Sequence, residues 1–108
     1  MIDKSFISIL LPTFNCDSIV QTTLETIMWA DEIIIIDSYS SDGTIEIAKT
    51  FGARVIQHEY INSAKQKNWA LQYCTYDWVF QIDSDELLEP NAENIIRSAI
   101  ANSTENVH

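Results

Sequence analysis

Glycine is scarce in this 108-residue chain, which contains only Gly43 and Gly52. Dinucleotide-binding G-x-G-x-x-G turns and P-loops need several glycines within a few residues. The composition therefore excludes both kinds of phosphate-binding loop. Cysteine is equally rare, because Cys16 and Cys74 form no C-x-x-C pair and are too few for a disulfide framework. We expect two buried or partly buried free thiols in a reducing compartment.

Basic residues are few as well, with six Lys and Arg against sixteen Asp and Glu and a formal net charge of −10. Nonspecific nucleic-acid binding depends on Lys and Arg that neutralise phosphates, and attraction to anionic membranes depends on the same charges. We therefore expect no nucleic-acid partner. A phosphate ligand would have to be received by a bound cation, by local lysines or by backbone amides.

Long apolar stretches are missing too. The longest run, 33–36, is far too short to cross a bilayer, and the first residues lack the basic and apolar segments of a signal peptide. We therefore expect a cytoplasmic protein. With 46% hydrophobic residues, the chain can bury a core, and its length suits one domain at most.

Apolar runs alternate with segments of helical spacing. The expected strands cover 6–11, 33–36, 54–57 and 78–82, and the expected helices cover 18–28, 44–51, 63–73 and 90–100. Asp17 or Ser18 is expected to cap the first helix, Gly52 to end the second, and the tail from Asn102 to fray. Near-continuous apolar strands predict an α/β fold, a parallel sheet of order 3-2-1-4 with helices on both faces.

Polar clusters follow three of these strands, in the segments 12–15, 37–43 and 83–86. Ligands of open α/β sheets bind outside the carboxyl ends of the strands, so the expected strand order brings all three clusters to one rim. Asp83 and Asp85 offer two carboxylates, and Mg²⁺ typically binds one or two carboxylates together with substrate phosphates. The pattern predicts a metal site for a phosphorylated ligand. The simpler alternative is a polar turn after a strand.

Four segments together resemble the family 2 glycosyltransferases of GT-A fold. They are Ile9-Leu10-Leu11-Pro12-Thr13-Phe14-Asn15, Ile36-Asp37-Ser38-Tyr39-Ser40-Ser41-Asp42-Gly43-Thr44, Lys67-Asn68-Trp69-Ala70-Leu71 and Ile82-Asp83-Ser84-Asp85-Glu86. The resemblance extends over about residues 6–90 and implies a Rossmann-like nucleotide-binding half-domain. Ala30-Asp31-Glu32 and Gln66-Lys67-Asn68 are most similar to the lipopolysaccharide-core β-glucosyltransferases.

The resemblance implies a role for each matched residue. The implied nucleotide-binding residues are Pro12, Thr13, Asn15, Asp37, Lys67 and Asp83, and the implied metal-binding residues are Asp85 and Asp83. Asp37 would hydrogen-bond the uracil or ribose, since an ionised carboxylate only accepts hydrogen bonds. Asp85 would contact Mn²⁺ or Mg²⁺ directly, and Asp83 would contact the ribose or the metal through water.

The resemblance implies an inverting transfer from a nucleotide-diphosphate sugar, a UDP-sugar, to a glycan or lipid-linked acceptor such as lipopolysaccharide. A divalent cation would stabilise the leaving diphosphate, and the attacking hydroxyl needs a general base. The acceptor would bring the protein to the periphery of the inner membrane. The family's general base and acceptor-binding region lie later in the domain than this chain extends, so no catalytic residue is assigned.

Two features depart from the family pattern. Tyr39 occupies a position where most members have glycine, and glycine permits positive φ at little cost. Either this loop follows another path or the Tyr39 ring stacks near the base. The chain also matches only the nucleotide-binding half. We therefore expect donor binding with weak or no transfer, and self-association or pairing with a C-terminal half through an unpaired sheet edge.

Other classes of protein use similar residues. A non-catalytic nucleotide or nucleotide-sugar binding module would need the same residues without the base. Receiver domains and haloacid-dehalogenase-type phosphatases need acidic residues after the first strand. That strand is followed here by Pro12-Thr13-Phe14-Asn15, so both are disfavoured.

Overall fold

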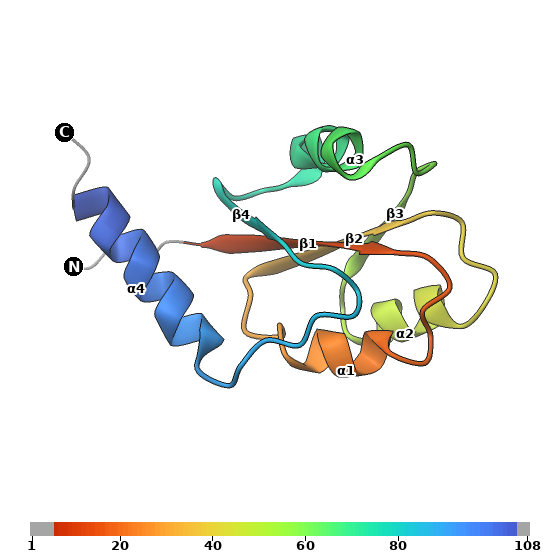
Figure 1. Ribbon diagram of the computed structural model, residues 1–108, viewed down its shortest axis with the longest axis horizontal. Helices are drawn as coiled ribbons and strands as arrows, with labels where there is room; N and C mark the ends of the chain where they lie inside the picture. The colour runs from red at the N-terminus through yellow and green to blue at the C-terminus, as the bar shows by residue number, and fades with distance from the viewer. Residues whose placement is uncertain (1–5, 106–108) are drawn as a thin grey trace.

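The computed structural model describes residues 6–105, whose strands form one parallel sheet of order β3-β2-β1-β4. The strands are β1 (Ile7–Thr13), β2 (Glu32–Asp37), β3 (Arg54–Gln57) and β4 (Trp78–Gln81). The helices are α1 (Val20–Glu25), α2 (Thr44–Thr50), α3 (Ser63–Ala70), the short 3-10 helix η1 (Leu71–Tyr73) and α4 (Ala92–Glu105). Figure 1 shows α3 on one face of the sheet and α1 and α2 on the other. The predicted strand order and the two covered faces are confirmed.

The isoleucine run of β2 supplies both halves of the core. Side chains alternate between the two faces of a strand. Ile33 and Ile35 belong to the cluster that includes residues of α1 and α2, whereas Ile34 and Ile36 pack with Ala70 of α3. An unbroken apolar run in this chain is therefore a central parallel strand that is buried on both faces.

The helix termini differ from the predicted ones. No side chain caps α1, because the Asp17 carboxylate instead accepts a 3.1 Å hydrogen bond from the Gly43 amide. The predicted cap by Asp17 or Ser18 is therefore wrong. Gly52 follows α2 with φ of 77°, as the predicted helix end requires.

The last helix is longer than predicted. The chain remains helical through Glu105, so the predicted fraying from Asn102 is wrong for the described residues, and 106–108 lie outside them. The side chain of Ile100 is only 2% exposed, and this burial favours continuing the helix.

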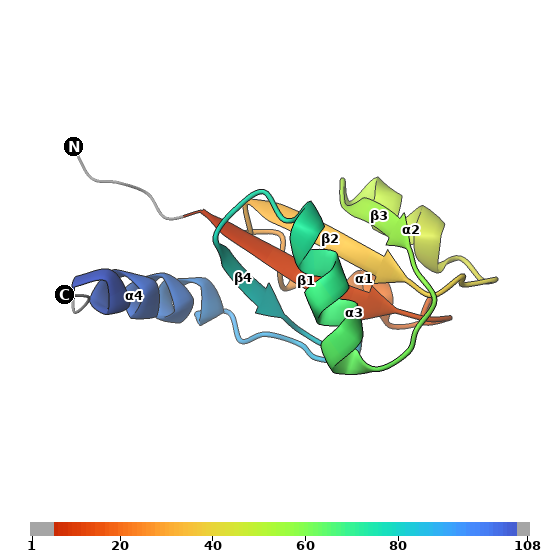
Figure 2. The same ribbon diagram turned by 90° about the horizontal axis from the view of Figure 1, so that it is seen from above.

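Helix α4 lies at the end of the sheet opposite the carboxyl ends of the strands, as Figures 1 and 2 show. The carboxylate of Asp31 holds it there, because Oδ2 accepts both the Ile7 amide at 2.9 Å and Nη2 of Arg97 at 3.3 Å. The rim where a ligand is expected is therefore free of this helix.

Strand β4 lies at an edge of the sheet, and its four residues are only partly buried. The expected self-association through an exposed edge stays a prediction. Cys16 and Cys74 are free thiols, as predicted, and burial raises the pKa of both. None of the helices within 6–105 is long and apolar enough to span a membrane.

Candidate functional site

The carboxyl ends of β1 and β2 are joined by a buried hydrogen bond. Thr13 and Asp37 are register partners in the parallel pair, and Thr13 Oγ1 donates to Asp37 Oδ1 at 2.6 Å. The Asp37 carboxylate also accepts the amide and the hydroxyl of Ser40 at 2.7 and 2.6 Å. The side chain is 0% exposed. The Asp37 carboxylate therefore accepts hydrogen bonds from within the protein, and these hydrogen bonds hold the following loop against β1.

The loop after β1 is fastened to the loop after β2. The backbone N–H of Asn15 donates to Ser40 Oγ at 2.8 Å. The side-chain Oδ1 of Asn15 accepts a 2.8 Å hydrogen bond from the Ser41 backbone N–H. Asp42 accepts the amide and hydroxyl of Thr44 and the amide of Asp17. Slight desolvation of Asp42 is outweighed by these hydrogen bonds, so its pKa is lowered. These hydrogen bonds join the two loops into one rim.

Tyr39 keeps the backbone conformation that glycine would favour. Its φ is 58°, its amide donates to Gln57 Oε1 at 2.8 Å, and its side chain is 64% exposed. A non-glycine residue in this region is strained. The positive φ is the conformation that glycine would adopt, and the Tyr39 ring lies beside the open cleft.

An open cleft of about 520 Å³ lies at this rim. Its walls are formed by Pro12, Thr13, Phe14, Ser38, Tyr39, Glu59, Tyr60, Gln66 and Ser84. The volume falls within the range of about 300–1,000 Å³ that is typical of small-molecule sites. Three of the lining residues, Phe14, Tyr39 and Tyr60, have exposed aromatic side chains. The cleft therefore suits a flat ligand with polar groups at its edge.

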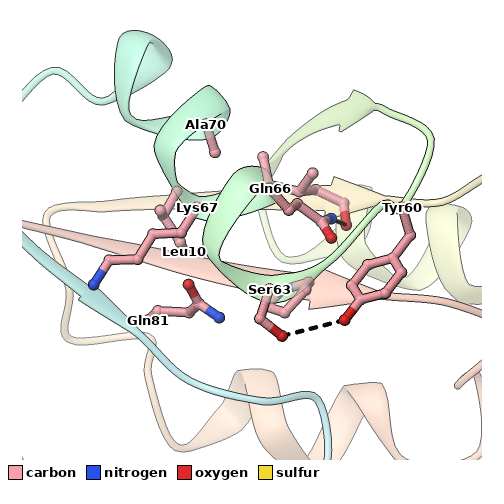
Figure 3. Close-up of a pocket in the computed structure, with 9 residues that line it drawn as sticks. Leu10, Tyr60, Ser63, Gln66, Lys67, Ala70 and Gln81 are labelled. Carbon is pink, nitrogen blue, oxygen red and sulfur yellow. Dashed lines mark hydrogen bonds between the residues drawn. The ribbon is translucent and has the colours of Figure 1, made fainter.

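Helix α3 presents two consecutive polar residues to this region. Figure 3 shows Gln66 on the Tyr60 side of a small adjoining pocket, whereas the side chain of Lys67 extends toward Gln81. Lys67 is exposed and Gln66 is buried. Tyr60 and Ser63 close the pocket through hydroxyl groups 3.2 Å apart. Lys67 is thus an exposed cation in the pocket that adjoins the cleft.

The acidic side chains of the loop after β4 are spread further apart than their closeness in the sequence suggests. Thr23 of α1 donates to the carbonyl oxygen of Ser84 at 2.5 Å, and the Asp83 amide donates to Glu86 at 2.7 Å. Ser84 lines the cleft, whereas Asp85 lines a separate hollow of about 190 Å³ beside α1. Both aspartates are exposed. Within 6–105, no three His, Cys, Asp or Glu side chains are close enough to form a metal site by themselves.

The structure therefore gathers some of the predicted residues and separates others. Pro12 and Thr13 line the cleft, Asn15 and Asp37 build its rim, and Lys67 adjoins it. Sequence reasoning assigned no role in the site to Tyr60, Ser84 or Gln66. The signal for Gln66 was available, since it lies four residues before the buried Ala70 and thus on the same helix face.

Comparison with known proteins identifies the family to which this chain belongs. The family model described as glycosyl transferase family 2 matches residues 8–107, and the chain therefore belongs to this family. It is 41% identical over 71 residues to an uncharacterized glycosyltransferase of Rickettsia typhi, covering 66% of this chain and 24% of that protein. It is 30% identical over 110 residues to the lipopolysaccharide core biosynthesis glycosyltransferase LpsC of Rhizobium meliloti, covering 97% and 41%.

A solved structure supports the fold. The glucosyl-3-phosphoglycerate synthase of Mycobacterium tuberculosis, in complex with Mn²⁺, UDP and glucosyl-3-phosphoglycerate, superimposes with a TM-score of 0.73 at 23% identity. The match covers 89% of this chain and 39% of the synthase. The chain therefore has the GT-A, Rossmann-like fold, and it spans well under half the length of these proteins.

Proposed function

We propose that this chain is the donor-binding part of an inverting glycosyltransferase that uses a UDP-linked sugar and a divalent metal. The observation that carries the proposal is the aromatic-walled cleft at the carboxyl ends of β1 and β2. The family membership and a synthase solved with UDP support a nucleotide-sugar donor. The similarity to LpsC supports a glycan or lipopolysaccharide-type acceptor.

The proposed nucleotide contacts are Pro12, Thr13, Asn15, Asp37, Lys67 and Asp83. Thr13 and Pro12 already face the cleft, and Lys67 can approach a diphosphate because its side chain is exposed beside the cleft. Asp37 is different, because it is 0% exposed, and a direct contact with ribose or base would require the loop that contains Ser40 to move. Without that movement, Asp37 acts by holding Thr13 and Ser40 in place.

The acidic loop fits a cation that is shared with a diphosphate. Asp83 and Asp85 are exposed oxygen donors on either side of Ser84, which lines the cleft. Mn²⁺ and Mg²⁺ accept oxygen ligands, and Mg²⁺ sites commonly combine one or two carboxylates with substrate phosphates. A pair of carboxylates without a third protein ligand matches that requirement. We propose Asp85 as the direct ligand, which requires its exposed side chain to turn from the hollow beside α1 toward the cleft, and Asp83 as a ligand through water.

The chemistry of transfer follows from these positions. A bound divalent cation would supply charge stabilisation to the diphosphate leaving group. Lys67, which lines the adjoining pocket, would add a positive charge near the diphosphate, and the joined loops after β1 and β2 would hold the nucleotide. The attacking hydroxyl needs a general base, and none is assigned among the residues of this chain. We therefore expect the 108-residue chain to bind the donor but to transfer sugar weakly or not at all.

Calorimetric titration of UDP into the purified chain, with and without Mn²⁺, tests this proposal. Binding should strengthen with Mn²⁺, and the gain should disappear in Asp85→Ala. Asp77→Ala is the matched control, because Asp77 is an exposed aspartate at the other end of β4. A folded chain that binds no UDP under either condition would overturn the proposed donor site.

A glycosyl-transfer assay on the same sample tests whether this chain catalyses the transfer by itself. Robust transfer by the purified chain would show that it carries its own general base. A non-catalytic nucleotide-binding module remains the second candidate, since no base is assigned in this chain. UDP binding without transfer, even by the longest natural form of the protein, would favour it.

A further inference from the structure

A threonine hydroxyl lies at a fully buried position of α1. The buried residues of this helix are Val20, Thr23 and Leu24, and each side chain is 0% exposed. The neighbours of Thr23 on this face are thus aliphatic. Because a buried hydroxyl without a hydrogen-bond partner is costly, Thr23 needs a partner at this position.

That partner belongs to the acidic loop after β4. Thr23 Oγ1 donates to the carbonyl oxygen of Ser84 at 2.5 Å, whereas the carbonyl oxygen of Ile19, one turn earlier in the chain, is 3.3 Å away. Because a hydroxyl has one hydrogen to donate, the shorter contact is the main hydrogen bond. Figure 1 shows the segment after β4 passing beside α1. The Thr23 hydroxyl therefore joins α1 to this loop.

The bonded carbonyl lies between the two proposed metal ligands in the chain, since it belongs to the peptide that links Ser84 to Asp85. The loop also has hydrogen bonds of its own. The Glu86 amide donates to the Asp83 carbonyl at 3.0 Å, and the Asp83 amide donates to Glu86 Oε1 at 2.7 Å. These two bonds shape the turn from within. The bond from Thr23 instead fixes the position of the turn relative to α1.

A second hydroxyl of the same segment contacts the chain further on. Thr26 comes three residues after Thr23 and so lies on the same side of the helical turn. Its Oγ1 accepts the Leu88 amide at 3.3 Å and donates to the Thr23 carbonyl at 2.7 Å. The contact with Leu88 is longer and lies beyond both aspartates. Thr23 is thus the threonine that bonds to the backbone between the proposed ligands.

We propose that Thr23 is a positioning residue for the divalent cation. Its hydroxyl holds the peptide between Ser84 and Asp85 in place, so that metal binding requires only the Asp85 side chain to turn. This inference rests on the proposed function, which assigns the cation to Asp83 and Asp85. A backbone that is already held lowers the cost of ordering the ligands when the metal binds.

Titration of UDP into the full 108-residue chain at a series of Mn²⁺ concentrations tests the inference. The quantity compared is the Mn²⁺ concentration that gives half of the gain in UDP affinity. Thr23→Val keeps the shape of the side chain and removes the hydroxyl, whereas Thr23→Ser keeps the hydroxyl and removes the methyl group. Ile27→Val is the matched control for lost packing, because Ile27 is equally buried and lies four residues later.

The Mn²⁺ concentration for half of the gain should rise about tenfold in Thr23→Val, because hydrogen-bonding partners behind metal ligands commonly change metal affinity by this amount or more. The affinity for UDP without Mn²⁺ should stay unchanged. Thr23→Ser and Ile27→Val should both keep the value of the unmodified chain. Circular dichroism verifies folding, and Thr23→Ala replaces Thr23→Val in the comparison with Thr23→Ser if the valine variant does not fold.

Two results would overturn the inference while leaving the proposed function in place. One is an unchanged Mn²⁺ requirement in folded Thr23→Val, which would give its hydroxyl a purely structural role. The other is an equal rise in Thr23→Ser or Ile27→Val, which would assign the effect to packing. If Mn²⁺ gave no gain in the unmodified chain, the proposed metal site would be rejected and this inference with it.

Discussion

Thr13 and Asp37 lie at the same level of two neighbouring strands and are joined by a 2.6 Å hydrogen bond between Oγ1 and Oδ1. Both side chains are almost fully buried. The aspartate cannot exchange this donor for water without opening the rim. The hydrogen bond therefore stabilises the fold and also shapes the cleft.

Replacing Thr13 by valine should destabilise the protein by about 1–3 kcal/mol, because the buried Asp37 carboxylate loses a donor while the side-chain volume is kept. Chemical denaturation measures this as a loss of unfolding free energy. Thr22→Val is the matched control, since Thr22 is exposed on α1. Equal effects of the two substitutions would contradict a special role for the Thr13 hydroxyl.

Replacing Tyr39 by asparagine should separate stability from binding. Asparagine tolerates positive φ better than tyrosine, so the unfolding free energy should rise by about 1 kcal/mol. UDP affinity should fall about tenfold, because stacking of a base on an aromatic ring is worth about 1–3 kcal/mol. Denaturation and calorimetry give the two quantities.

Tyr39→Phe serves as the control for that substitution, since it keeps the ring and removes only the hydroxyl. We expect it to bind UDP as the unmodified chain does. If Tyr39→Asn bound UDP with undiminished affinity, the ring would have no part in holding the base.

Glu32 should contribute a pH-dependent part of the stability. Partial burial alone would raise its pKa, but hydrogen bonds from the amide and hydroxyl of Thr75 and from Ser8 outweigh burial and lower the pKa below its ordinary 4.5. A carboxyl group whose folded pKa is lowered stabilises the protein above the unfolded pKa, and this contribution is lost as pH falls through the folded pKa.

Glu32→Gln should therefore destabilise the protein at neutral pH, and the difference from the unmodified chain should shrink below about pH 4.5. Unfolding free energies measured from about pH 6 down to about pH 3 check this. Glu25→Gln is the control, because Glu25 is an exposed glutamate at the end of α1. A difference that stayed constant with pH would point to packing instead of charge.

The fold was predictable because its signals are local. The run Ile33–Ile36 is buried on both faces, and runs of this kind separated by helical spacing specify a covered parallel sheet. The capping of α1 was not predictable, since Asp17 bonds instead to Gly43, a residue of another loop. Competition between partners distant in sequence has no local signature.

The site was predictable in its location but not in its detail. The carboxyl ends of β1 and β2 do form the rim, as their polar clusters indicated. The sequence could not show that Asp37 would be fully buried with hydrogen bonds from Thr13 and Ser40, or that Asp85 would line a hollow beside α1. The burial of Gln66 beside the Ile36 carbonyl depends on a partner thirty residues away in the sequence, so it was not predictable locally.

The strand order β3-β2-β1-β4 also affects the sequence of events during synthesis. The first three strands to leave the ribosome are consecutive neighbours in the sheet, and β4 joins last at the open edge of β1. The joined loops after β1 and β2 can thus assemble before α3 and the acidic loop exist. A nascent chain can therefore acquire the rim first and receive Gln66, Lys67 and Ser84 as later additions to a template already in place.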